Sequence, residues 1–141
     1  SAHSPEAALL AMREFDFDTI LYPINFCTHF KGKFSQQVLE EAKKRDMGIL
    51  ALKAMAKQHW QNEEDESTHP KCWYEPVEDP FLAEDALSWT LSQGVTAAIP
   101  PGDENLFKLA LQIAPNVKPV TQETSEKLEK MAQTLDPIFM A

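Results

Sequence analysis

Short apolar runs alternate with helix-forming segments along this chain, and that alternation is the strongest constraint on its fold. Three runs of β-forming residues lie at about 18–25, 47–54 and 95–99. They show little polar alternation, which is typical of strands covered on both faces in a parallel sheet. Because helical patterns separate them, we expect the strands to pair in parallel through helical crossovers.

Five segments carry helix signals. Ser-Pro-Glu at 4–6 combines a hydroxyl N-cap, a proline at the first helical position and an acid that suits the helix dipole. Ser35 is placed to cap the second helix, and Gly48 and Gly94 are placed to end the second and third. The expected helices span about 5–14, 36–45, 82–93, 103–114 and 122–135.

The order of elements favours part of a larger domain. Three strands alone leave two exposed sheet edges, and the chain begins on a helix cap with no strand before it. A long segment at about 57–80 breaks the alternation and is expected to be a loop. Residues 1–114 are expected to form the α/β unit, and residues 115–141 a helical extension.

Composition and charge exclude several classes of protein. The contents of 43% hydrophobic and 25% charged residues are ordinary for a soluble globular protein, and no apolar run approaches the ~20 residues of a membrane span. The net charge of −9 argues against nucleic-acid binding, which needs Lys and Arg to neutralise phosphates. Cys27 and Cys72 lie outside any C-x-x-C pattern, so we expect reduced thiols and a cytoplasmic location.

Histidines and cysteines gather in two places that resemble a metal site only superficially. One group is His59, His69 and Cys72, and the other is Cys27 and His29. Their spacings match no common zinc pattern, so no metal is expected.

The long segment also carries aromatic and acidic residues. Cys-Trp-Tyr-Glu-Pro at 72–76 is expected to fold back across the mouth of the sheet, with direct contact to substrate as the alternative. The acidic run at 62–67 is expected to be an exposed loop tip, or else a docking site. Trp60 and Trp89 are expected to pack, Trp89 on the inner face of the third helix.

Three strand-and-loop segments, separated by helical patterns, follow one another along the chain: FDTILYPINF at 17–26, GILALKAMA at 48–56 and AIPPG at 98–102. This ordered set resembles the last three strands and following loops of an aldo-keto reductase barrel. The LKAMA stretch at 52–56 is similar to a Met-Lys-Pro-Leu-Ala stretch of some bacterial members of the family. Ser-Ala-His-Ser at 1–4 resembles the end of the strand that precedes these three.

The resemblance implies a fold and an activity. The fold would be a partial (β/α)₈ TIM barrel, α/β in class, with three or four parallel strands, flanking helices and a C-terminal helical extension. The family reduces aldehydes and ketones with a nicotinamide cofactor, usually NADPH. Its catalytic Asp, Tyr, Lys and His lie on loops of the first four strands, which this chain does not contain. Lys53 falls on the wrong strand, so no catalytic residue is expected and the chain alone should be inactive.

The same resemblance implies a cofactor wall at the carboxyl ends of the strands, where function gathers in such barrels. This chain has Leu52 where the family commonly stacks an aromatic ring on the nicotinamide, and Leu21 where a Gln meets the carboxamide. The Pro-Gly turn at 101–102 leads into a helix N-terminus that offers N–H groups to a phosphate. Asp103 and Glu104, however, stand where the family often places cations. The candidate residues for NADP or NAD are Asn25, Leu52, Lys53, Met55, Pro101, Gly102, Asp103 and Lys108.

A second hypothesis is a non-catalytic α/β module that binds a ligand or partner. Its open sheet edges would need cover, so self-association is expected. The departures at Leu21 and Leu52 favour this module, whereas the ordered strand ends favour a reductase that acts on a small carbonyl substrate. Cofactor titration followed by the fluorescence of the three tryptophans would separate the two hypotheses.

Overall fold

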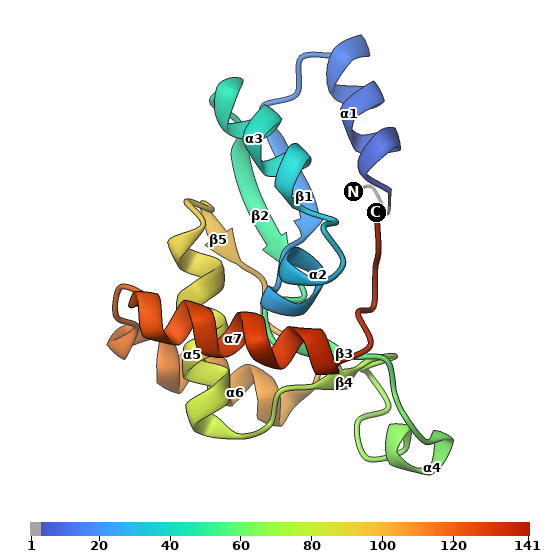
Figure 1. Cartoon of the computed structure of the whole chain (residues 1–141), viewed down its shortest axis with the longest axis vertical. Coiled ribbons are helices and arrows are strands. Elements are labelled where there is room, and N and C mark those ends of the chain that lie inside the picture. The colour runs from blue at the N-terminus through green and yellow to red at the C-terminus, as the bar shows by residue number, and fades with distance from the viewer. Residues whose placement is uncertain (1–3) are drawn as a thin grey trace.

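Three parallel strands form the central sheet, in the order β1-β2-β5 (Figure 1). They are β1 (Thr19–Pro23), β2 (Gly48–Leu52) and β5 (Ala97–Ala98). Helix α3 (Gln36–Lys44) lies between the first two in the chain, and α5 (Pro80–Ser92) precedes the third. The expectation of a mixed α/β chain with parallel strands is therefore confirmed.

The computed structural model describes residues 4–141, without the side chains of residues 63 and 64. The segment at 1–4, expected to end a preceding strand, lies outside the described residues except for Ser4. The Ser4 Oγ atom caps the first helix by accepting a hydrogen bond from the Ala7 N–H at 3.0 Å. The remaining elements are α1 (Pro5–Glu14), α2 (Phe26–Phe30), β3 (Ala56–Gln58), α4 (Glu63–Glu66), β4 (Glu75–Pro76), α6 (Glu104–Ile113), a 3-10 turn (Ala114–Asn116) and α7 (Gln122–Thr134).

The five predicted helices are present, with ends that differ by at most two residues from the expected ones. Helix α2 was not expected, because its five residues are too few to show a helical period. In the part of the chain that the structure describes, no helix is both long enough and apolar enough to cross a membrane.

The prediction of a loop at 57–80 is wrong where short elements form, although residues 59–62, 67–74 and 77–79 carry no helix or strand. Strands β3 and β4 pair antiparallel in this segment, and α4 lies between them. Side chains also join the two strands, because Glu75 accepts hydrogen bonds from both Lys57 and Gln58. We call residues 56–76 the hairpin excursion.

The third strand is shorter than the predicted 95–99, although its pairing extends beyond the two residues of β5. The N–H of Thr96 donates to the Ile49 carbonyl, and the N–H of Ile99 donates to the Ala51 carbonyl, both at 2.8 Å. Backbone hydrogen bonds therefore anchor the whole of this short segment to β2.

The two faces of the sheet differ in their cover. Ile20 pairs with Ile49 and Tyr22 with Ala51, so these four residues share one face. Tyr22, Ile49 and Ala51 are buried in the main core, together with Trp89 of α5 as predicted. On the other face, Leu21, Leu50 and Leu52 are only half-buried, so the expectation that both faces are covered holds for one face alone.

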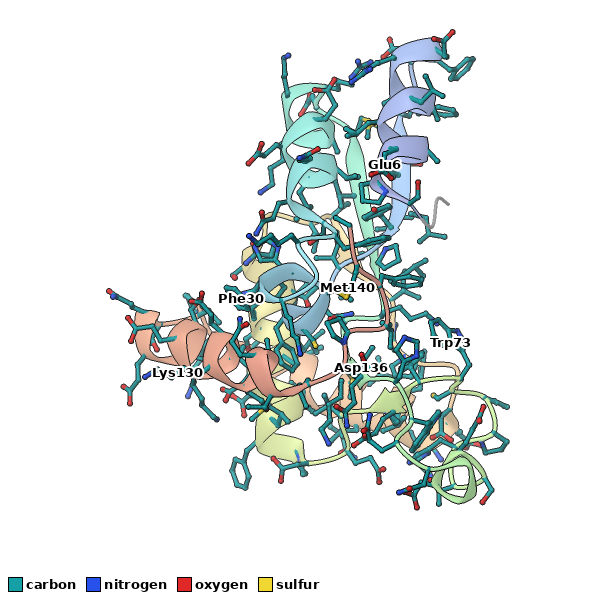
Figure 2. The ribbon with its side chains drawn as sticks, turned by 45° about the vertical axis from the view of Figure 1, so that its right-hand side comes forward. Glu6, Phe30, Trp73, Lys130, Asp136 and Met140 are labelled. Carbon is teal, nitrogen blue, oxygen red and sulfur yellow. The ribbon has the colours of Figure 1, made fainter. Side chains whose placement is uncertain are left out.

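The C-terminal segment returns across the carboxyl edge of the sheet (Figures 1 and 2). Helix α7 packs against α2 and α5. Beyond it, the Asp136 carbonyl accepts a hydrogen bond from the His59 N–H at 3.0 Å, and the Ala141 N–H donates to the Gly32 carbonyl at 2.9 Å. Residues 135–141 thus tie α2 to the hairpin excursion, and we call them the tail.

Candidate functional site

The carboxyl ends of β1 and β2 bring two of the predicted residues to one edge of the sheet. Pro23 pairs with Leu52, and the N–H of Ile24 donates to the Leu52 carbonyl at 2.9 Å. Lys53 therefore directly follows one of these aligned strand ends, and Asn25 lies two residues beyond the other. In a parallel sheet such ends are the usual place for a ligand.

Asn25 carries an orphaned donor at this edge. The residue is 1% exposed, and its Oδ1 atom caps α2 by accepting a hydrogen bond from the Thr28 N–H at 2.9 Å. Its Nδ2 atom is buried and has no hydrogen-bond partner among the described residues. Because an unpaired buried amide costs about 1–3 kcal/mol, this donor marks a position where a further acceptor would be favourable.

Lys53 has an unusual backbone and an ammonium group without an acceptor. Its φ of 66° lies in the left-handed region, which is disfavoured for a residue with a Cβ atom. The Nζ atom lies 4.5 Å from the ring centroid of Tyr74 and 5.2 Å from that of Trp73. Across residues 4–141, apart from the two undescribed side chains, no oxygen accepts a hydrogen bond from Nζ. Burial lowers the pKa of Lys53, while the neighbouring Cys72 acts in the opposite direction.

The hairpin excursion brings the aromatic rings to Lys53. Tyr74 directly precedes β4 and is almost fully buried, and burial raises the pKa of its phenol. Cys72 is also buried, which raises the pKa of its thiol. The Nε1–H of Trp60 donates to the Cys72 carbonyl at 2.8 Å and holds this stretch in place. The predicted packing of Trp60 is therefore confirmed. Within the segment 72–76, Tyr74 packs against Lys53 at the carboxyl edge of the sheet.

Asp103 occupies the helix N-terminus that had been expected to meet a phosphate. Its Oδ1 atom accepts hydrogen bonds from the N–H groups of Asn105 at 2.9 Å and Leu106 at 3.1 Å. Its Oδ2 atom lies 3.4 Å from Nδ1 of His69, and Nε2 of His69 lies 3.0 Å from Oε1 of Glu78. The hydrogen bond from Leu106, followed by the bonds from His69 and Asn105, lowers the pKa of Asp103.

This arrangement does not fit an anion at the start of α6. The carboxylate already takes the free N–H groups that a phosphate would need. Gly102 has open space where a side chain would stand, and no described atom approaches that position within 4 Å. Lys108 is exposed, and its Nζ atom lies 2.7 Å from Oε1 of Glu104. Its charge is therefore paired with a neighbouring acid on α6.

The eight candidate residues therefore fall into separate groups. Asn25 and Lys53 share the sheet edge, and Cys72 links this edge to Asp103, since both Lys53 and Asp103 affect its pKa. Leu52 is half-buried on β2, whereas Met55 and Pro101 are buried. Gly102 and Lys108 lie outside this cluster on exposed positions.

Sequence reasoning missed the part that His69 plays. This residue was considered only as a metal ligand, and its contact with Asp103 joins positions 34 residues apart. No local pattern predicts such a pair, although a half-buried His between two acids is recognisable once the hairpin excursion is in place. In the described part of the chain, no group of three His, Cys, Asp or Glu residues could hold a metal ion.

Comparisons with protein-family models, with curated proteins and with solved structures found no match to this chain.

Proposed function

We propose that the chain is the C-terminal part of an NAD(P)H-dependent aldo/keto reductase, a (β/α)₈ barrel enzyme that reduces carbonyl compounds to alcohols. The observation that carries this proposal is the order of the sheet. Strands β1, β2 and β5 run parallel and stand in the sheet in the order in which they occur in the chain. Helices α2 and α3 separate the first two strands, the hairpin excursion and α5 separate the second and third, and α6 follows the third. Successive units of a barrel have this arrangement.

The uneven cover of the sheet supports the same proposal. Tyr22, Ile49 and Ala51 face the packed helices, while Leu21, Leu50 and Leu52 are half-buried. In a closed barrel the second set would point into the barrel interior, where branched apolar side chains form layers. The two cysteines are both buried and unpaired, which suits a reducing compartment, and we place the protein in the cytoplasm.

The chain would contribute to cofactor binding and not to the chemical step. A bound nicotinamide cofactor supplies the hydride in this class of enzyme. The groups that this chain offers to it are the Nζ atom of Lys53 and the Nδ2 atom of Asn25, both without acceptors among the described residues. The start of α6 does not fit a phosphate group, because Asp103 caps it.

Two experiments test this function. Because the catalytic tetrad belongs to strands that this chain lacks, the 141-residue chain mixed with NADPH and a reactive aldehyde should show no turnover above background. The coding sequence upstream of Ser1 should continue in frame through four more βα units with Asp, Tyr, Lys and His at strand ends. Clear turnover by the chain alone, or an upstream frame without these residues, would contradict the proposal.

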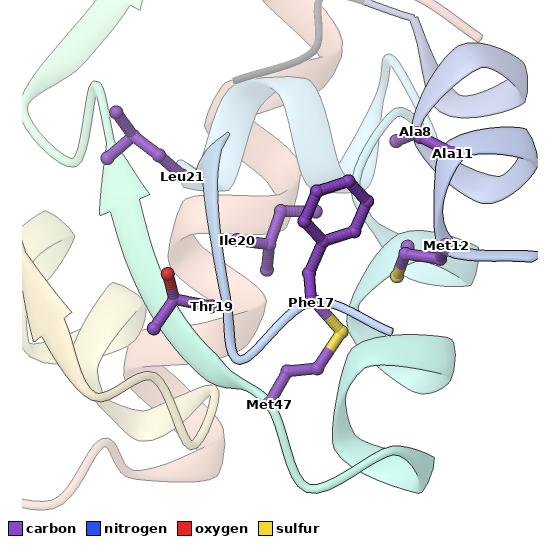
Figure 3. Close-up of a pocket in the computed structure, with 8 residues that line it drawn as sticks. All are labelled: Ala8, Ala11, Met12, Phe17, Thr19, Ile20, Leu21 and Met47. Carbon is purple, nitrogen blue, oxygen red and sulfur yellow. The ribbon is translucent and has the colours of Figure 1, made fainter. Parts of the chain in front are cut away.

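A second candidate is a binding module that self-associates through its open edge, and one surface favours it. An apolar pocket of about 170 Å³ lies between α1 and β1, with Met12, Phe17 and Met47 among its lining residues (Figure 3). Phe17 remains 42% exposed and packs against the exposed ring of Phe15, with the centroids 4.6 Å apart. Apolar side chains beside an unpaired strand edge are typical of a surface that another chain covers.

Sedimentation velocity separates this candidate from the first. A self-associating module should sediment as a dimer or larger species, and Phe17→Lys should shift it toward the monomer. A monodisperse monomer at all concentrations would exclude a module that self-associates through this edge.

A further inference from the structure

Trp73 is a large aromatic side chain that remains open at the carboxyl edge of the sheet. It is 46% exposed, although the adjacent Tyr74 is only 3% exposed. Its ring stands edge-on to Tyr74, with centroids 5.5 Å apart at 90°, and to Phe139 of the tail, with centroids 5.7 Å apart at 73°. Figure 2 shows it on the side of the molecule along which the tail runs. The indole therefore packs against two rings and still presents surface to solvent.

A cation without an acceptor lies against this ring. Lys53 Nζ is 5.2 Å from the Trp73 centroid, and within the described residues it has ring contacts but no carboxylate or carbonyl partner. A half-buried ammonium group normally gains charge-assisted hydrogen bonds to an anion. The left-handed backbone at Lys53 has a conformational cost, which indicates that the surrounding structure fixes the position of this residue.

We propose that Lys53 and Trp73 together form a binding site for a flat aromatic anion, namely a nucleotide. The ring of the ligand stacks on the indole of Trp73, and its phosphate accepts hydrogen bonds from Lys53 Nζ. Aromatic side chains beside basic groups bind nucleotides in this way, and stacking of one base contributes about 1–3 kcal/mol. The choice of nicotinamide nucleotides as ligands rests on the proposed function, whereas the stacking site follows from the geometry of the two residues.

Binding to the 141-residue chain tests the proposal. Isothermal titration would use three probes: NADPH, reduced nicotinamide mononucleotide, and adenosine 2′,5′-bisphosphate. The last two separate the nicotinamide ring from the adenine ring, so they identify the ring that stacks. Trp73→Leu should weaken the binding of NADPH and of the matching half by about fivefold to 150-fold, the range measured for loss of one stacked ring.

Three further variants keep the outcome clear. Trp73→Phe retains an aromatic face and should preserve most of the affinity. A thermal unfolding midpoint of Trp73→Leu close to that of the native chain shows that its weaker binding is not a loss of folding. Lys53→Met should weaken all three phosphorylated probes and reduce the dependence of binding on salt concentration. Phe81→Leu changes a 78% exposed ring on α5 that is not among the ring contacts of Lys53 or Trp73 in the described residues, and it should leave binding unchanged.

The results distinguish this inference from the proposed function. Unchanged nucleotide binding by Trp73→Leu, or no binding of any probe by the unmodified chain, would overturn the Lys53–Trp73 site. Either result leaves the reductase proposal to its own tests, the upstream reading frame and aldehyde reduction by the complete protein. If the chain binds a nucleotide through Trp73 while the complete protein reduces no carbonyl compound, the site stands and the reductase function fails.

Discussion

The Nζ atom of Lys53 lies 4.5 Å from the ring centroid of Tyr74, and that ring is almost completely buried. Removal of the ammonium group therefore affects a contact that solvent screens only in part. Cation–π contacts of this kind contribute about 0.5–2 kcal/mol. The contact also favours the charged form of Lys53, whereas burial alone lowers its pKa.

A double-mutant cycle should detect this contact. Lys53→Met combined with Tyr74→Leu should give a coupling free energy of about 0.5–2 kcal/mol in urea unfolding, because only the pair of native side chains makes the contact. Tyr74→Phe is the matched control, since it keeps the ring and removes only the hydroxyl group. A Tyr74→Leu cycle with no more coupling than the Tyr74→Phe cycle would show that the ring and the cation do not interact.

Substitution of Gly32 should release the tail. A Cβ atom at this position would come within 2.4 Å of the Phe139 carbonyl oxygen and 2.7 Å of the Thr28 carbonyl oxygen, and both are backbone atoms that cannot easily move. Gly32→Ala should therefore lower the free energy of unfolding by about 1–3 kcal/mol and make the tail more sensitive to proteolysis.

Gly102→Ala is the control for the Gly32 variant, because no described atom lies within 4 Å of its added Cβ. It should change stability by no more than about 0.5 kcal/mol. Equal effects of the two substitutions on thermal unfolding would argue against close packing of the tail on Gly32.

Asp103 should make the stability of the protein depend on acid pH. Its pKa in the folded chain lies below the ordinary value, chiefly through the hydrogen bond from Leu106. A carboxyl group with a depressed pKa stabilises the fold above its unfolded pKa of about 3.9, and this contribution is lost as the pH falls through the folded pKa. Between pH 7 and pH 3, the native chain should therefore lose more stability than Asp103→Asn.

The asparagine at position 103 would keep an acceptor for the N–H groups at the start of α6, so it separates charge from capping. Asp103→Ala removes both and should cost about 1 kcal/mol at pH 7. Urea unfolding of the three proteins at both pH values provides the measurement. If the free energy of unfolding depends on pH identically in the native chain and in Asp103→Asn, Asp103 does not contribute to the loss of stability in acid.

Asn25 should show separable effects of its two side-chain atoms. Asn25→Ala removes the cap on α2 that Oδ1 provides, whereas Asn25→Ser keeps an acceptor for the Thr28 N–H and removes the unpaired Nδ2 donor. The alanine variant should therefore be less stable than the serine variant by about 1 kcal/mol. Thermal unfolding of both variants would detect this difference. A serine variant less stable than the alanine variant would mean that Nδ2 of Asn25 has a favourable partner.

The sequence predicts the elements that carry complete local signals. Helix α1 begins at the residue expected from Ser4-Pro5, and its hydroxyl cap is present. Strands β1 and β2 lie within the predicted apolar runs, because each has five residues, enough for a continuous run of β-forming side chains to show in the sequence. These features depend on neighbours in the chain, which a pattern can record.

The site itself depends on contacts that no local pattern records. Strands β3 and β4 have three and two residues, too few for any alternation to appear. Their pairing nonetheless brings Trp73 and Tyr74 to Lys53, twenty residues earlier in the chain. Lys53 was predicted at the edge of the sheet from the position of its strand, but its partners could be found only once the excursion was folded.

The return of the tail to α2 sets a condition on the order of folding during synthesis. Lys31 Nζ donates to the Leu135 carbonyl across 104 residues, and the Gly32 carbonyl accepts from Ala141. Neither bond can form until residues 135–141 have left the ribosomal exit tunnel, whereas β1 and β2 need only the first half of the chain. On the nascent chain, Phe34 and Trp73 therefore lack their contacts with the ring of Phe139. Until the tail is synthesised, this aromatic surface is exposed and accessible to a chaperone.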